Sequence, residues 1–238
     1  MKYLGIDGCK GGWFLVGLDQ DMSGAFTILQ SVHELFEYLG IAELVLLDIP
    51  IGLRGRSPVE RLCDKEARSL LGSGRGSSVF PAPSRCALGC VSYKEGSDKN
   101  RECTGRGLSQ QSWAIVPKIQ EVDAYLQQEA QRAKIREIHP EICFWALNRQ
   151  RPMEHNKKTE EGYEQRIALL ARYLPGVRKI VETALSRYLR KQLARDDIVD
   201  ALMGAVTASL PGVLQTIPAV PEIDDAGLPM EMVYRTPM

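Results

Sequence analysis

A surplus of charge of either sign is absent from this sequence, in which 30 lysines and arginines balance 30 aspartates and glutamates over 238 residues. A protein that coats nucleic acid over much of its surface is strongly basic, so this balance argues against that class of protein. A local basic groove is still compatible with it. The composition, 44% hydrophobic and 25% charged, is ordinary for a globular protein.

Long apolar runs are absent as well. No segment approaches the roughly 20 apolar residues that a membrane-spanning helix requires. The chain starts Met-Lys and then enters a predicted strand that Asp7 interrupts, so we expect no export signal. The sequence therefore predicts a soluble, cytoplasmic protein with no membrane partner.

A C-x-x-C pair is the third absence, because the six cysteines are scattered along the chain. Without an export signal, we expect free thiols in a reducing compartment. A zinc site built from Cys86, Cys90 and Cys103 with Cys63 or His155 is the alternative, and the missing C-x-x-C pair disfavours it.

The first 48 residues predict an α/β fold. Apolar segments separated by short polar links predict an antiparallel meander over residues 3–7, 13–19 and 25–30. A capped helix over residues 31–40 and a fully buried strand over residues 44–48 follow. Later signals predict further helices at 57–72, 116–131, 159–173 and 177–210, the last bent near Asp196, with a strand near 135–139 and an irregular proline-rich tail. We expect one domain over residues 1–238, with an insertion at about 53–108.

Gly5, Gly8 and Gly11 raise the possibility of a nucleotide-binding loop. Such loops connect a strand to a helix, whose N-terminus holds the phosphate. Here the glycines lead into the apolar run "WFLV", which predicts a strand. The glycine-rich hairpin instead offers a backbone that a phosphate or a metal can approach closely.

Acidic residues stand where elements would meet. In the order 3-2-1-4-5, Asp7 and Asp48 end neighbouring parallel strands, and the carboxyl ends of parallel strands form ligand sites. Asp197 and Asp200 share one face of a late helix. Small residues at 201, 204 and 208 let that helix approach the sheet, while Asp196 is expected to cap it.

Clustered carboxylates repel one another, and a divalent cation relieves that repulsion. Oxygen ligands without cysteine or histidine favour Mg²⁺ or Mn²⁺. Two such ions about 4 Å apart can activate water for attack on a phosphodiester. Each acid alone also has an ordinary interpretation, as a turn former or a helix cap.

The segments "GIDGCKGGW", "DIPIGL", "SSVFPAPSR", "HPE" and "DDIVDA" together resemble an uncharacterised family of predicted RNase H-like nucleases, in the resolvase-like branch of the ribonuclease H-like superfamily. The resemblance implies an RNase H-like α/β fold, in which a mixed five-stranded sheet of order 3-2-1-4-5 is flanked by helices. It also implies metal-dependent cleavage of nucleic acid. It implies that Asp7, Asp48, Asp197 and Asp200 hold metal. Glu141 is a further catalytic candidate, with pairing to an arginine as the alternative.

Cations and aromatic side chains would bind the substrate. The candidates are Arg54, Arg85, Lys158, Arg166 and Phe80, with Arg56, Arg68, Arg75 and Lys157 as further cations. Trp13 and Trp145 are expected in the core, and His139 is a weaker candidate as base or ligand.

The predicted function is a metal-dependent phosphodiester hydrolase that cleaves DNA or RNA by two-metal in-line attack of water. The alternative is a non-catalytic nucleotide or nucleic-acid binder on the same fold. Actin-like phosphotransfer is disfavoured, because the chain has no second phosphate hairpin. No oligomeric state follows from the sequence.

Overall fold

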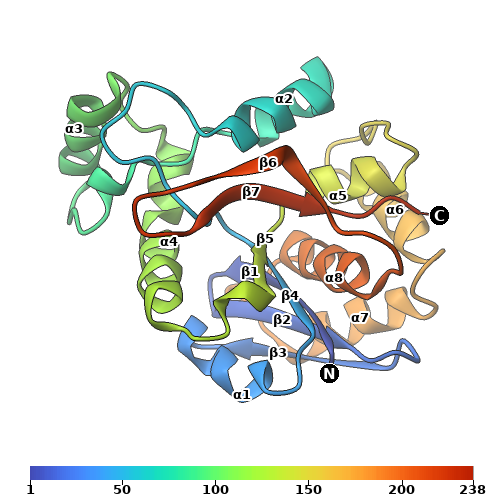
Figure 1. Cartoon of the computed structure of the whole chain (residues 1–238). Coiled ribbons are helices and arrows are strands. Elements are labelled where there is room, and N and C mark those ends of the chain that lie inside the picture. Colours follow the sequence, from blue (N-terminus) through green and yellow to red (C-terminus); the bar gives the residue numbers. More distant parts are fainter. Residues whose placement is uncertain (238) are drawn as a thin grey trace.

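The computed structural model describes residues 1–237 and is built on a mixed five-stranded sheet (Figure 1). The strands are β1 (Tyr3–Cys9), β2 (Gly12–Leu18), β3 (Gly24–Leu29), β4 (Leu44–Asp48) and β5 (Ile135–Glu137). Their order is β3-β2-β1-β4-β5, in which β1 to β3 form the antiparallel meander and β4 and β5 run parallel to β1. The predicted α/β fold and sheet order are confirmed.

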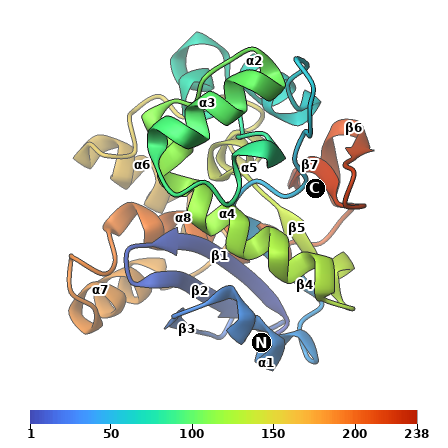
Figure 2. The same ribbon diagram turned by 90° about the vertical axis from the view of Figure 1, so that its left-hand side faces the viewer.

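Helices cover both faces of this sheet (Figures 1 and 2). One face carries α7 (Val177–Arg187) and α8 (Arg195–Ser209), and the other carries α1 (Phe36–Leu39) and α4 (Gln110–Gln128).

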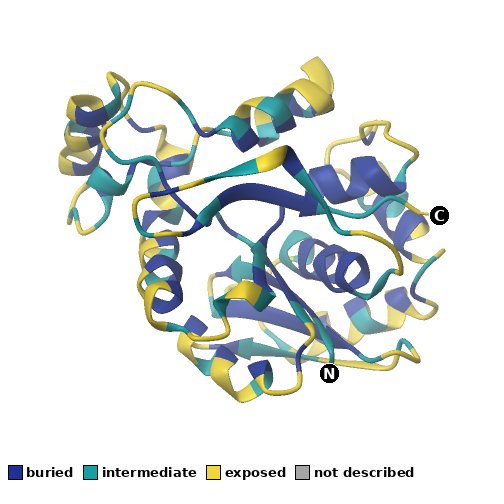
Figure 3. Ribbon diagram, in the orientation of Figure 1, coloured by how far each residue is buried: buried dark blue, intermediate teal, exposed yellow. Residues whose placement is uncertain are grey.

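Strand β4 shows how the core divides between the two faces. Leu46 belongs to the hydrophobic cluster that contains α8, whereas Val45 and Leu47 belong to the cluster that contains α4. Burial on both faces explains the continuous apolar run of this strand. Helix α8 is itself buried along nearly its whole length (Figure 3), with every residue from Ile198 to Ala208 in the core.

Between β4 and α4 the chain forms the insertion, residues 53–108. It contains α2 (Leu62–Arg75), α3 (Tyr93–Thr104) and two short 3-10 helices, Gly76–Ser78 and Arg85–Ala87. Cys86 and Cys103 are joined by a disulfide, so the expectation of six free thiols is wrong for this pair. The same bond removes two of the ligands of the alternative zinc site.

The proline-rich tail is ordered, contrary to expectation. It forms a hairpin of β6 (Gln215–Ile223) and β7 (Pro229–Tyr234). A two-stranded sheet leaves one edge of each strand unpaired, where proline costs no ladder hydrogen bond. The hairpin lies between α2 and β5 (Figure 1) and joins the insertion to the sheet.

Several helix boundaries differ from the predictions. Segment 31–40 is a 3-10 helix, Val32–Leu35, followed by the short α1. The Ser57 hydroxyl accepts a hydrogen bond from the Val59 nitrogen in a local turn, and α2 begins only at Leu62.

The predicted long helix 177–210 is two helices, because the chain becomes extended at Tyr188. The backbone N–H of Gly11 donates to the Gln192 carbonyl at 2.8 Å and holds this break against the β1–β2 turn.

The remaining helices are α5 (Pro140–Leu147) and α6 (Glu160–Leu170), with a 3-10 turn at Arg132–Lys134. Helix α6 begins next to Thr159, where the sequence predicts a helix start, and the Thr159 hydroxyl caps it by accepting a hydrogen bond from the Gly162 nitrogen. Among the described residues, no helix combines the length and the apolarity needed to cross a membrane.

Candidate metal site

Asp7 and Asp48 end neighbouring strands at the same level of the sheet. In the parallel register of β1 with β4, the two residues lie directly opposite each other. Because side chains alternate along a strand, Asp7 shares its face with Gly5 and Asp48 shares its face with Leu46. This is the face that α8 covers.

Helix α8 approaches this face closely because two glycines meet there. A Cβ atom on Gly5 would lie 2.0 Å from the nitrogen of Ala205 and 2.1 Å from the oxygen of Ala201. A Cβ atom on Gly204 would lie 3.0 Å from the Cα of Gly5. The close contact brings Asp200, one turn earlier in α8, to the carboxyl ends of β1 and β4.

The three aspartates form one cluster. One carboxylate oxygen from each of Asp7, Asp48 and Asp200 lies within 4.8 Å of the other two. Burial raises the pKa of Asp7 and of Asp48 well above the usual range, and the neighbouring carboxylates raise both further. Burial also raises the pKa of Asp200. An ionised cluster of this kind therefore requires a cation.

The ammonium group of Lys157 supplies part of that charge. Its Nζ atom lies 2.5 Å from Oδ2 of Asp200. Burial lowers the pKa of Lys157, but the three carboxylates outweigh this effect and raise the pKa above its ordinary value. One ammonium group cannot neutralise three ionised carboxylates, so the cluster still has affinity for a further cation.

The donor set fits a hard divalent cation. Its three oxygens come from β1, β4 and α8, and no histidine or cysteine belongs to the group. Mg²⁺ and Mn²⁺ prefer such ligands. Over residues 1–237, neither Asp197 nor Glu141 belongs to this group.

Asp197 caps helix α8. Its Oδ2 accepts a hydrogen bond of 2.9 Å from the Ala194 backbone nitrogen, so the prediction that gave the cap to Asp196 is wrong. Burial raises the pKa of Asp197 to about 6. Its side chain lines a groove beside the cluster.

Glu141 lies in the first turn of α5 and pairs with Arg166, as the alternative interpretation expected. Arg166 is only 1% exposed and also donates to the carbonyls of His155 and Gly162. It is therefore an internal support and not a phosphate ligand, which corrects its predicted role. The second oxygen of Glu141 is buried without a hydrogen-bond partner, and Glu141 is one of the residues that line the acidic cavity.

This acidic cavity has a volume of about 520 Å³ and contains the three aspartates. Phe80 and Lys158, both predicted to bind substrate, line it. His139 lines it too, with Nε2 3.3 Å from the Ser78 oxygen, and burial lowers its pKa. His139 does not belong to the group of three aspartates, so the structure does not support it as a metal ligand.

Two other predicted cations lie elsewhere. Arg54 binds Glu222 of the hairpin through hydrogen bonds of 2.5 and 2.6 Å. Arg85 pairs with Asp123 at 2.5 Å and with Asp224. Neither arginine lines the acidic cavity, because carboxylates from distant segments hold both guanidinium groups.

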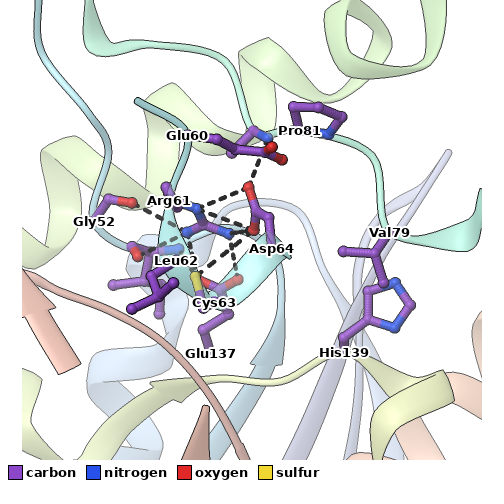
Figure 4. A network of polar contacts seen from close by, with 12 residues as sticks. Gly52, Glu60, Arg61, Leu62, Cys63, Asp64, Val79, Pro81, Glu137 and His139 are labelled. Atoms are coloured by element: carbon purple, nitrogen blue, oxygen red, sulfur yellow. Dashed lines mark hydrogen bonds and ion pairs between the residues drawn. The ribbon is translucent and has the colours of Figure 1, made fainter. Parts of the chain in front are cut away.

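A second polar centre, which the sequence did not predict, lies where the start of α2 meets β5 (Figure 4). Arg61 is 2% exposed and donates to Asp64 at 2.5 Å and to both oxygens of Glu137 at 2.8 Å. It also donates to the carbonyls of Ile51 and Gly52 at 3.1 Å.

Cys63, Asp64 and Glu137 lie close enough together to hold a metal ion, and the Arg61 network includes two of them, Asp64 and Glu137. A guanidinium group already fills the space between these carboxylates. The network ties the loop after β4 to α2 and β5, and so supports the wall of the acidic cavity. The R-x-x-D spacing at the start of α2 is the sequence signal that indicates it.

Trp13 and Trp145 are buried, as predicted. The indole nitrogen of Trp13 donates to Glu121 at 3.0 Å, which satisfies its only polar atom.

Comparisons with known proteins give one match. No curated protein and no solved structure matches the chain. The match is to a family model over residues 5–223, a span that contains all three clustered aspartates and Lys157. The chain therefore belongs to the family described as "Protein of unknown function (DUF429)".

Proposed function

We propose that this protein is a metal-dependent phosphodiester hydrolase that acts on DNA or RNA in the cytoplasm. The observation that supports the proposal best is the convergence of Asp7, Asp48 and Asp200 within 4.8 Å at the carboxyl edge of the sheet. The resemblance of the sequence motifs to predicted RNase H-like nucleases points to the same chemistry.

The three aspartates would hold Mg²⁺ or Mn²⁺. When bound, the cation would supply the charge that acidifies water and stabilises the developing charge on the phosphate. Lys157 orients the Asp200 carboxylate through their 2.5 Å hydrogen bond. Glu141 lines the same cavity with one oxygen that has no hydrogen-bond partner, and it would be a candidate to assist a second cation.

Purified protein should cleave a panel of DNA and RNA oligonucleotides when Mn²⁺ or Mg²⁺ is present, and chelation should stop the cleavage. Asp7→Asn should reduce cleavage by about a hundredfold or more, since it removes a ligand. Asp98→Asn is the matched control, because Asp98 is a surface residue of α3 that pairs only with Lys94 and Arg101.

Cleavage that persists in Asp7→Asn would refute the assignment. Oligonucleotide binding with no cleavage at any metal concentration would favour the alternative, a non-catalytic binder of nucleic acid.

A further inference from the structure

A groove of about 580 Å³ runs beside the acidic cavity, and nothing in the proposed chemistry uses it. It passes the β1–β2 turn between α4 and the connection from α7 to α8, three segments that lie together in Figure 2. The hydrogen bond from Gly11 to Gln192 fixes the turn against this connection. This contact joins two of the segments that form the groove.

The charge of this groove is strongly biased. Only two carboxylates line it, those of Asp196 and Asp197. Six cationic side chains line it: Lys10, Lys118, Lys157, Lys158, Arg190 and Arg195. The whole chain has no net charge, so this bias is a local concentration of positive charge. Such a surface attracts a polyanion.

Half of these cations are free to bind a ligand. Lys118 donates to the Gly12 carbonyl at 2.6 Å, and Arg195 pairs with Glu160 at 2.9 Å. Within residues 1–237, no carboxylate lies within ion-pair distance of Lys10, Lys158 or Arg190, and all three are exposed. Three unpaired cations along one groove are available to neutralise phosphates of a bound polyanion.

The groove adjoins the acidic cavity. Residues from three segments line both spaces, namely the end of β1, helix α4 and the loop before α6: Gly8, Ile115, Lys118, Lys157 and Lys158. The Lys118 side chain packs against Gly8 at this shared boundary. A chain of phosphates in the groove would therefore lead to the aspartate cluster.

The size of the acidic cavity limits which part of a nucleic acid can enter it from the groove. Its volume of about 520 Å³ lies in the range of small-ligand pockets. Its apolar wall, with Phe80, Pro140 and Met232, offers an aromatic ring to one base. A space of this size admits a nucleotide and not a stacked duplex.

We propose that the groove binds the phosphates of a single nucleic-acid strand and that the acidic cavity receives one nucleotide of that strand. The substrate class is then single-stranded nucleic acid or an unpaired strand end. This inference rests on the proposed function for its ligand class.

Binding is measured in EDTA by fluorescence anisotropy, with a labelled single-stranded 12-mer and the same sequence as a duplex. The single strand should bind more tightly. The double variant Lys10→Ala, Arg190→Ala should lower the slope of log K against log salt by about 1.4, since each lost contact to a single strand removes about 0.7.

Lys65→Ala with Lys179→Ala is the matched control, because both lysines are exposed and neither lines the groove. An unchanged slope in the groove variant, or equal affinity for duplex and single strand, would overturn the inference. The outcomes separate this inference from the hydrolase proposal. Single-strand binding without cleavage in Mn²⁺ supports the groove as the strand-binding site and rejects the hydrolase proposal. Cleavage in Mn²⁺ with an unchanged salt slope rejects only the strand-binding role of the groove.

Discussion

At the scale of single residues, the acidic site stores unfavourable electrostatic energy. Burial raises the pKa of Asp7, Asp48 and Asp200, and repulsion from neighbouring carboxylates raises the pKa of each further. Isolated surface aspartates have no such cost. Sites that bind cations or reacting groups are where such strain is found, because the ligand relieves it.

Removing one charge from the cluster should therefore stabilise the metal-free protein. The folded-state pKa of Asp7 lies above the unfolded value of about 3.9, so the folded state binds the extra proton and loses stability as the pH rises through that raised pKa. We expect Asp7→Asn to have a higher Tm than the wild type in EDTA at pH 8, and the difference to vanish near pH 4. Thermal unfolding at several pH values measures this, and a destabilised variant at pH 8 would contradict it.

Lys157 should act as an internal substitute for part of the cation's charge. Lys157→Gln removes the ammonium group that faces Asp200, and we expect a loss of about 1 to 2 kcal/mol of stability in EDTA. Saturating Mn²⁺ should restore more stability to the variant than it adds to the wild type. Urea unfolding with and without Mn²⁺ tests this against Lys158→Gln, whose exposed side chain makes no ion pair in the described chain. Equal Mn²⁺ stabilisation in both variants would show that Lys157 does not compensate the cluster.

At the scale of elements, the site depends on the contact between α8 and β1. Helix and strand backbones touch at Gly5 and Gly204, and this contact determines how far Asp200 reaches toward Asp7. Any side chain at this crossing would push the helix away from the sheet. The metal site is thus a consequence of backbone packing as much as of its ligands.

Gly5→Ala should disrupt both packing and metal binding. The new methyl group would lie 2.0 Å from a backbone nitrogen, which no side-chain movement can relieve. We expect a loss of about 1 to 3 kcal/mol or more, together with weaker Mn²⁺ binding measured by calorimetry. Gly40→Ala is the control, since a Cβ atom there meets nothing within 4 Å. A Gly5→Ala variant with wild-type stability would disprove the close crossing.

At the scale of the whole molecule, the C-terminal hairpin holds the insertion to the sheet. Its acidic residues pair with two arginines of the insertion and one of β5: Glu222 with Arg54, Asp224 with Arg85, and Glu231 with Arg136. Asp224 also accepts a hydrogen bond of 2.9 Å from the Leu53 nitrogen, at the start of the insertion. The insertion, which supplies Phe80 to the cavity, therefore depends on the last strands of the chain.

Asp224→Ala should destabilise the whole fold. The carboxylate accepts hydrogen bonds from the backbone nitrogens of Leu53, Ala226 and Leu228, and its loss leaves the Arg85 pair incomplete. We expect a loss of about 3 to 5 kcal/mol in urea unfolding. Asp225→Ala, at the exposed neighbouring position, should change stability by less than about 0.5 kcal/mol. Similar urea midpoints for Asp224→Ala and Asp225→Ala would show that the hairpin does not hold the insertion to the sheet through Asp224.

The sequence alone determined the sheet and the acids of the site. Apolar runs and their polar links predicted the strands, and the positions of Asp7 and Asp48 at strand ends followed from the same pattern. The order 3-2-1-4-5 came from the resemblance of the sequence motifs to RNase H-like proteins. The small residues of α8 predicted its close approach. These features are local or periodic, so hydrophobic patterning reveals them before any contact is known.

Only the tertiary structure decided which charges meet. Arg85 pairs with Asp224 across 139 positions, and Arg61 reaches Glu137 across 76. The tertiary structure also pairs Lys157 with Asp200, and it is the tertiary structure that shows the tail as a hairpin. No local pattern encodes such pairs, because the free energy of a buried charge depends on which distant segment supplies its partner and excludes water from it.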